Sequence, residues 1–247
     1  MINRAQDHNN LEAITANYKP SEDTIAVVRS AKIALLVGVS GAGKGTIKAE
    51  LINTGNYYPM VSHTTRKPRV NNGKPEIDGE DYHFIDLDEA KLMVEAGGFV
   101  EVKPYSGNLY GTSTDDIEVA ASKGKIALND IEVQGVGEYL EISDRVTALF
   151  ILPPSVEKWQ ERTLGRGETD ALLARIATAP TELRTALDEP RYHFVINDQL
   201  DETVSYVRQI IESGNVDPEK EAAGRELAQA LLQQTVALLG LEQEKEA

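Results

Sequence analysis

The sequence contains no cysteine, which excludes disulfide bonds and metal sites built from thiolates. Its four histidines are scattered and do not show the spacing of metal ligands. No apolar run approaches the length of a membrane span, and the sequence shows no signal peptide. We therefore expect a cytoplasmic protein with no membrane partner.

Positive charge is also scarce, because 25 Lys and Arg face 40 Asp and Glu, giving a net charge of −15. Such a balance argues against nucleic acid or anionic membranes as partners. A site for an anionic ligand must then gather its cations locally, and basic residues do gather at 66–74 and 158–175. The length of 247 residues and 41% hydrophobic content suit one large domain, or one domain with appendages.

The most informative stretch is KIALLVGVSGAGKGT, residues 32–46. Its apolar run 33–37 predicts a buried parallel strand, and a glycine-rich turn and a helical pattern follow. Glycines allow backbone N–H groups to turn toward a phosphate, the helix N-terminus adds a positive dipole, and Lys44 adds a full charge. A turn that binds nothing would not need this lysine. The usual loop has Ser or Thr directly after the lysine, whereas here Gly45 intervenes before Thr46, a spacing typical of nucleoside monophosphate kinases.

The second basic stretch, SHTTRKPRVNNGKPEIDGEDYHF (62–84), contains prolines and Asn-Gly and Asp-Gly pairs that predict an irregular excursion. Arg66, Arg69 and Tyr82 could clamp an oxyanion, because guanidinium groups bind phosphate oxygens through two hydrogen bonds and a phenol adds another. A solvated basic loop is the alternative interpretation.

Alternation of apolar and polar residues predicts a strand at 99–105, and further strands are predicted at 125–132, 146–152 and 193–196, separated by helices. This succession of strands and helices predicts an α/β fold with a mostly parallel sheet. Glu101 lies in an apolar neighbourhood, and Asp130 and Glu132 lie at the carboxyl end of the strand 125–132, where magnesium and substrate bind in such folds. Asp130 could equally cap a turn or helix.

Two helices flank the turn at 165–167, and the second, from about residue 171, carries Arg175. This arrangement is typical of a closing lid, with a helical hairpin bearing surface arginines as the alternative. Asp217 and Pro218 begin an amphipathic helix, expected to fold back on the domain in preference to forming a dimer contact. Near the other end, Ser21 is expected to cap a structural helix.

Eight blocks together resemble the guanylate kinase family, in order and at nearly the family's spacing, from about residue 32 to 213. They are GVSGAGKGT (38–46), SHTTRKPR (62–69), DGEDYHF (78–84), YSGNLYGT (105–112), NDIEVQG (129–135), PPS (153–155), GRG (165–167) and VIND (195–198). Departures from the family pattern are Val39 for proline, extra residues at 71–75, Glu132 for aspartate, and a lid about two residues short.

The resemblance implies a three-layer P-loop kinase domain at 31–213, with a GMP-binding arm at about 63–112 and a helical lid at about 155–177. Residues 1–30 would be an N-terminal extension and 214–247 a C-terminal helix. The implied reaction transfers the γ-phosphoryl group of ATP to GMP, and to dGMP, in a monomer or homodimer. Mg²⁺ would arrive with ATP, held mainly by phosphates and water, with Thr46 or Asp130 as the candidate protein contact.

The resemblance also assigns site residues. For ATP they are Gly38, Val39, Ser40, Gly41, Ala42, Gly43, Lys44, Gly45, Thr46, Arg166 and Asn197, the last of these near the adenine. For GMP they are Ser62, Arg66, Arg69, Tyr82, Glu101, Tyr110, Thr112 and Glu132. The catalytic set is Lys44, Arg66, Arg166 and Arg175.

Two other functions compete with this one. A guanylate-kinase-like interaction domain would lack the loop lysine and glycines, which this sequence retains. A kinase for a ribose bisphosphate would discard the residues that read guanine, but Ser62, Glu101 and Thr112 are present.

Overall fold

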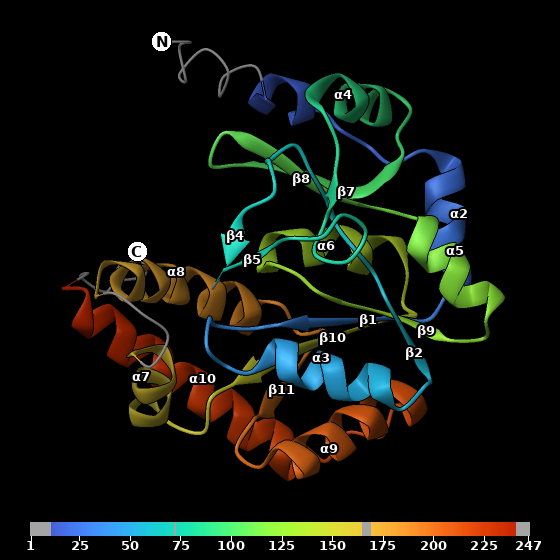
Figure 1. Cartoon of the computed structure of the whole chain (residues 1–247). Helices are drawn as coiled ribbons and strands as arrows, with labels where there is room; N and C mark the ends of the chain where they lie inside the picture. Colours follow the sequence, from blue (N-terminus) through green and yellow to red (C-terminus); the bar gives the residue numbers. More distant parts are fainter. Residues whose placement is uncertain (1–10, 72, 165–168, 241–247) are drawn as a thin grey trace, which may run out of the picture. The chain divides into compact units, whose positions relative to one another are not determined.

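The computed structural model describes residues 11–71, 73–164 and 169–240. They form an α/β fold with mostly parallel pairing in its main sheet (Figure 1), divided between two compact units. We call the first the arm unit, with described residues in 11–33, 56–129 and 137–146. The second, the loop unit, comprises 34–55, 130–136 and the described residues from 147 onward.

The loop unit is built on parallel strands that are buried on both faces. β10 pairs in parallel with β11, and β1 is the next strand after β10. All five residues of β1 and six of the seven in β10 are buried, as expected for a sheet covered on both sides. The strands are β1 (Ile33–Val37) and β10 (Val146–Leu152), whose first residues are counted with the arm unit, and β11 (Tyr192–Ile196). The helices are α3 (Lys44–Asn53), α7 (Val156–Leu164), α8 (Thr169–Asp188), α9 (Leu200–Ser213) and α10 (Pro218–Leu238).

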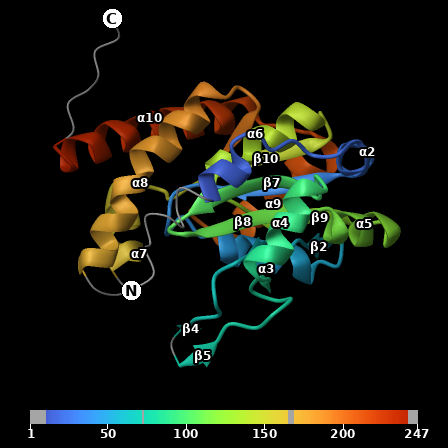
Figure 2. The same cartoon turned by 90° about the horizontal axis from the view of Figure 1, so that it is seen from above.

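The arm unit contains a four-stranded sheet in the order β6-β3-β8-β7, in which β8 runs antiparallel to both neighbours. The β4–β5 hairpin extends away from β7 and β8 (Figure 2). The sheet strands are β3 (His63–Thr64), β6 (His83–Phe84), β7 (Phe99–Tyr105) and β8 (Asn108–Ser113), and the hairpin is β4 (Val70–Asn71) and β5 (Lys74–Pro75). The remaining elements are α2 (Glu22–Ser30), β2 (Tyr57–Pro59), α4 (Leu87–Glu95), α5 (Asp115–Ser122) and β9 (Ile126–Asp130), and α6 (Val133–Ile142) begins in the loop unit and ends in the arm unit.

The N-terminal segment packs on the start of β7. Leu11 belongs to the same apolar cluster as Phe99, and the Tyr18 hydroxyl bonds both backbone groups of Phe99, accepting from its N–H at 2.8 Å and donating to its carbonyl oxygen. Burial raises the pKa of Tyr18 to about 12, so the hydroxyl keeps the proton it donates. Ser21 caps α2 as predicted, accepting from the Thr24 N–H.

The C-terminal helix α10 packs on α8 and β11 in the loop unit (Figure 1). Asp217 and Pro218 begin it as predicted. Gly224 makes the close approach to β11 possible, since a Cβ atom there would lie 2.7 Å from the Cβ of Phe194. Leu231 is buried on the same helix. None of the helices in the described part of the chain combines the length and apolar character of a membrane span.

Several elements differ from the sequence-based expectation. The stretch expected to be irregular contains the short strands β3 to β6, and β8 and α6 were not predicted. The polar sequence of β8 lacks alternation, yet it pairs because Gly111 lets β7 approach: a Cβ atom there would lie 2.8 Å from the carbonyl oxygen of Glu101. Two glycines at positions 135 and 137 lower the helix propensity of α6 and obscure it.

We predict that Leu231→Ala will lower the free energy of unfolding by about 2–5 kcal/mol, because it leaves a cavity between α10 and the rest of the loop unit. The matched control is Leu238→Ala on the same helix, where the side chain is 57% exposed. Thermal and urea unfolding should separate the two variants, and equal stability losses would contradict the burial of α10.

Candidate active site

The loop between β1 and α3 has the backbone of a phosphate cradle. Gly38, Gly41 and Gly43 have φ angles of 135°, 88° and 99°, which residues with a side chain rarely adopt. At Gly38 a Cβ atom would lie 2.2 Å from the carbonyl oxygen of Ile151, so no side chain fits. Gly43 is the N-cap of α3, and no side chain caps this helix. Its first N–H groups can therefore bind an anion.

Lys44 is the first residue of α3, and its ammonium group folds back over the loop. The Nζ atom donates to the carbonyl oxygens of Gly38 and Val39, the second at 3.4 Å. The lysine is only partly buried. This arrangement places a full positive charge beside the helix N-terminus, where phosphates bind in loops of this kind.

Three side chains from later in the chain hold the loop in place. The Asn197 amide nitrogen donates to the Ala42 carbonyl oxygen at 2.7 Å, and the Trp159 indole donates to the Ser40 carbonyl oxygen at 2.7 Å. Arg162 in turn donates to the Asn197 carbonyl oxygen at 3.1 Å. Sequence reasoning did not assign Trp159 or Arg162 to the site, although Trp159 is the only tryptophan in the chain. The predicted contact of Asn197 with adenine stays a prediction.

Acidic side chains in the loop unit differ in what surrounds them. Asp130 pairs with Lys48, with 2.6 Å between Oδ1 and Nζ, while Glu132 is exposed before α6. Glu182 of α8 was not predicted; burial raises its pKa, helped by the Glu132 charge and opposed by Thr178 and Lys44. In the described part of the chain, no group of three His, Cys, Asp or Glu side chains could hold a metal ion.

The arm unit holds a buried arginine in a defined orientation. The Arg66 guanidinium donates from Nε to the Tyr110 hydroxyl at 3.2 Å and lies 5.2 Å from the centre of the Tyr82 ring. It also forms an ion pair with Glu76, with 2.7 Å between Nη1 and Oε2. The side chain of Glu76 holds the pKa of Arg66 above its usual value, and Arg66 holds that of Glu76 below its own. Arg69 is exposed nearby in sequence.

Glu101 on β7 ends a chain of hydrogen bonds. Thr112 donates to Glu101 Oε1 at 2.9 Å, so its only hydroxyl proton is used and Ser62, 3.1 Å away, must donate to Thr112. Asn129 donates to Ser62 at 3.4 Å. Burial raises the pKa of Glu101 to about 7 despite the Thr112 bond, with Glu138 raising it and Lys103 lowering it by smaller amounts. Asn129 was not predicted individually.

The predicted residues thus fall into two groups. The loop unit brings the donor residues Gly38 to Thr46 together with Asn197, and it also contains Glu132. In the arm unit, Arg66 contacts both Tyr110 and Tyr82. In a second cluster of the same unit, Thr112 contacts both Ser62 and Glu101. Arg166 lies outside the described residues, and of Arg175 the structure describes only its position within α8.

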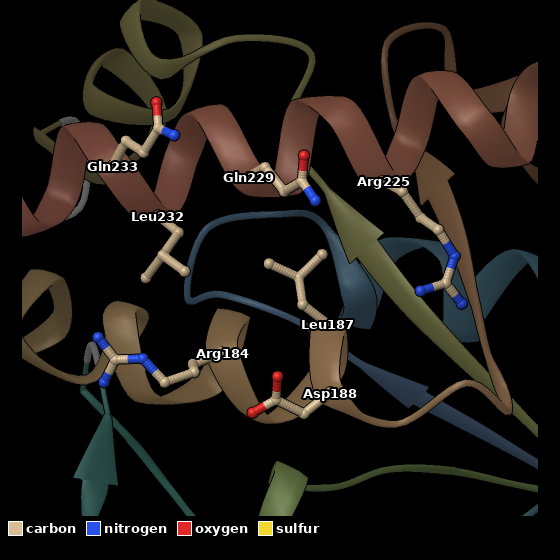
Figure 3. A pocket seen from close by; sticks show the side chains of 7 residues that line it. All are labelled: Arg184, Leu187, Asp188, Arg225, Gln229, Leu232 and Gln233. Atoms are coloured by element: carbon tan, nitrogen blue, oxygen red, sulfur yellow. The ribbon is translucent and has the colours of Figure 1, made fainter. Parts of the chain in front are cut away.

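A cavity of about 520 Å³ between α8 and α10 contains none of the predicted residues (Figure 3). Arg225 at one end already donates to Glu221 and to the carbonyl oxygens of Pro190 and Tyr192. The cavity therefore offers no pair of uncommitted arginines to an anion. It is lined by Arg184, Leu187, Asp188, Arg225, Gln229, Leu232 and Gln233.

The loop unit has buried parallel strands and a glycine loop that leads into the uncapped helix α3, and Lys44 is the first residue of that helix. These features define a P-loop nucleotide-binding fold. Residues 30–214 match the family model described as guanylate kinase. The chain therefore belongs to the guanylate kinase family.

Individual relatives agree with this assignment. A guanylate kinase of Thermus thermophilus is 34% identical over 178 residues, covering 70% of this chain and 77% of the relative. That of Synechocystis is 34% identical over 183 residues, covering 73% and 93%. A crystal structure of guanylate kinase from Anaplasma phagocytophilum has a TM-score of 0.56 at 26% identity and covers 81% of this chain and 94% of its own.

We predict that Glu101 makes folding less favourable as pH rises. Below pH 4.5 the folded and unfolded chains both bind this proton; between about 4.5 and 7 only the folded chain retains it, so stability falls by roughly 3 kcal/mol across this window. The stability of Glu101→Gln relative to the unmodified chain should therefore increase from pH 4.5 to 7.5 in urea titrations.

The control for this experiment is Glu118→Gln, which changes an exposed glutamate on α5 of the same unit. Between pH 4.5 and 7.5 its difference from the unmodified chain should change much less than that of Glu101→Gln, because its side chain is exposed. A Glu101→Gln difference that is equally flat would contradict the raised pKa.

Proposed function

We propose that this chain transfers the γ-phosphoryl group of ATP to GMP, producing ADP and GDP. The observation that carries the choice of acceptor is the buried Glu101 carboxylate, which accepts from Thr112 and lies in the same unit as the Arg66 anion site. Membership of the guanylate kinase family supports the same reaction. The proposal assigns the donor phosphates to the loop unit and the acceptor to the arm unit.

On the donor side, the loop amides and Lys44 would hold the ATP phosphates. The uncapped start of α3 supports this role, because its N–H groups have no side-chain acceptor. Asn197 would lie near the adenine while it braces Ala42. One proton of its amide nitrogen is committed to that loop carbonyl oxygen, so the second proton and the side-chain oxygen would serve the ligand.

On the acceptor side, Arg66, Arg69, Tyr82 and Tyr110 would bind the monophosphate. The contact between Arg66 and Tyr110 supports this assignment, because it joins two of the four groups in one cluster. Glu101 would read the base, assisted by Ser62 and Thr112, while Glu132 is proposed as a further contact to GMP.

Guanine fits a buried carboxylate better than adenine does. Its N1–H and exocyclic amine are adjacent donors, and one carboxylate can accept from both. Adenine presents an acceptor at N1 and would leave Glu101 poorly paired, which costs about 1–3 kcal/mol. Because guanine would donate two hydrogen bonds to the ionised carboxylate, its binding would lower the pKa of Glu101, which is about 7 in this structure.

Phosphoryl transfer requires two anions to be held in line while their repulsion is neutralised. Arg166 and Arg175 would supply positive charge to the transferring group when the lid closes, as an arginine finger acting within one chain. Mg²⁺ would enter with the ATP phosphates, with Thr46 or Asp130 as its protein contact. When bound, the ion neutralises charge on the β- and γ-phosphates. The donor set fits this mode, since Thr46 is exposed at the helix start and Asp130 is the last residue of β9.

An assay of ADP release with GMP, dGMP, AMP, UMP and ribose 1,5-bisphosphate tests the proposal. We expect turnover with GMP well above that with AMP, because only guanine pairs both its donors with Glu101. In Glu101→Ala this preference should largely disappear. Turnover no greater with GMP than with AMP in the unmodified chain would refute the function, and preferential use of the bisphosphate would establish the competing kinase.

We also predict that Lys44→Ala will lower kcat by roughly 10²-fold or more, because the ammonium group would stabilise charge on the transferred phosphoryl group. Circular dichroism and thermal unfolding should report an intact fold. Lys91→Ala, on α4 of the arm unit, is the control and should turn over normally. Near-normal kcat in Lys44→Ala would remove this lysine from the mechanism.

A further inference from the structure

Glu76, which follows the β4–β5 hairpin, contacts Arg66 through both carboxylate oxygens. Oε2 lies 2.7 Å from Nη1 and Oε1 lies 3.0 Å from Nη2. The two side chains are only 9% and 8% exposed, so water does not screen this pair as it would a surface pair. Two parallel hydrogen bonds to one carboxylate fix the plane of a guanidinium as well as its position.

A count of the Arg66 protons identifies the edge left for a ligand. The guanidinium has five N–H groups. Nε donates to Tyr110, Nη1 donates to the Lys67 carbonyl oxygen at 2.8 Å and to Glu76, and Nη2 donates to Glu76. Within the described residues, one Nη2 proton remains. A carboxylate spanning Nη1 and Nη2 uses the protons that point away from Nε, so the remaining one lies on the edge that faces Tyr110.

Glu76 is itself held by Arg69, the second arginine of the arm. The Arg69 backbone N–H donates to Glu76 Oε2 at 2.7 Å, and the Glu76 N–H donates to the Arg69 carbonyl oxygen at 2.9 Å. These bonds close the base of the hairpin and bring both arginine positions to one carboxylate. Arg66 holds the pKa of Glu76 below its usual value, so the carboxylate is charged at neutral pH.

We propose that Glu76 is a positioning residue for the acceptor phosphate, an inference that rests on the proposed role of Arg66 in binding GMP. The carboxylate fixes the far edge of the Arg66 guanidinium. The near edge then presents the remaining Nη2 proton toward Tyr110, and the Tyr110 hydroxyl lies beside it as a second polar group. Glu76 acts through Arg66 and need not touch the substrate.

The opposite role, in which Glu76 occupies the phosphate site and competes with GMP, predicts the opposite kinetics. A competitor would have to leave before GMP binds, so its removal would tighten GMP binding. A positioning residue aligns Arg66, so its removal lets the guanidinium turn and weakens GMP binding even though the site becomes more positive. Glu76 occupies the edge of the Arg66 guanidinium that points away from Nε, while Tyr110 lies at the other edge. This arrangement favours the positioning role, because the edge beside Tyr110 is left for the phosphate.

The experiment compares Glu76→Gln with Glu80→Gln, a change of an exposed glutamate in the same arm. For Glu76→Gln we expect KM for GMP to rise about tenfold, with KM for ATP within about twofold of the unmodified chain. Glu76→Asp should recover part of the loss, and Glu80→Gln should leave both constants unchanged. An unchanged or lower KM for GMP in Glu76→Gln would overturn the proposal.

Arg66→Lys and the double variant Arg66→Lys/Glu76→Gln separate this inference from the function on which it rests. If Glu76 acts through Arg66, the double variant should raise KM for GMP hardly more than Arg66→Lys alone. If Arg66→Lys leaves KM for GMP unchanged, the proposed role of Arg66 fails. If Arg66→Lys raises it and Glu76→Gln does not, only the inference about Glu76 fails. Thermal unfolding of each variant checks that the fold is retained.

Discussion

The loop between β1 and α3 can present N–H groups to an anion only if its own carbonyl oxygens are satisfied elsewhere. The loop unit does this at alternate residues. Lys44 binds the oxygen of Gly38, Trp159 binds that of Ser40, and Asn197 binds that of Ala42. Two of these three donors come from positions more than 100 residues later in the chain. The geometry of the loop thus depends on the folded unit around it, and the glycines alone do not determine it.

The arm uses two carboxylates in opposite ways. Burial raises the pKa of Glu101, although the Thr112 hydroxyl and Lys103 oppose this shift. Glu76 lies against the Arg66 guanidinium, so its pKa is lowered. The chain has a net charge of −15, but both pKa shifts arise from the immediate surroundings of each carboxylate. Local partners set the charge of each group at neutral pH, and the overall charge has little influence on either.

The sequence was sufficient to predict the buried strands β1 and β10, because nearly all residues in their runs are apolar. It also predicted the glycine loop before α3, and it placed Glu101 in an apolar neighbourhood, where the side chain is indeed buried; the contact of Glu101 with GMP stays a prediction. It did not predict Glu76 as the partner of Arg66, or Trp159 as a brace of the loop. A glutamate in a polar stretch and a tryptophan on a helix have ordinary patterns. Their roles arise from tertiary contacts that periodicity does not encode.

The Tyr18 hydroxyl covers part of one edge of the arm sheet. β7 is the outermost strand of its sheet, and strands in that position offer unpaired backbone groups to any passing chain. Tyr18 satisfies both the N–H and the carbonyl oxygen of Phe99, as a neighbouring strand would. A segment that lies before the region matched by the family model therefore protects the beginning of β7 against intermolecular pairing and aggregation.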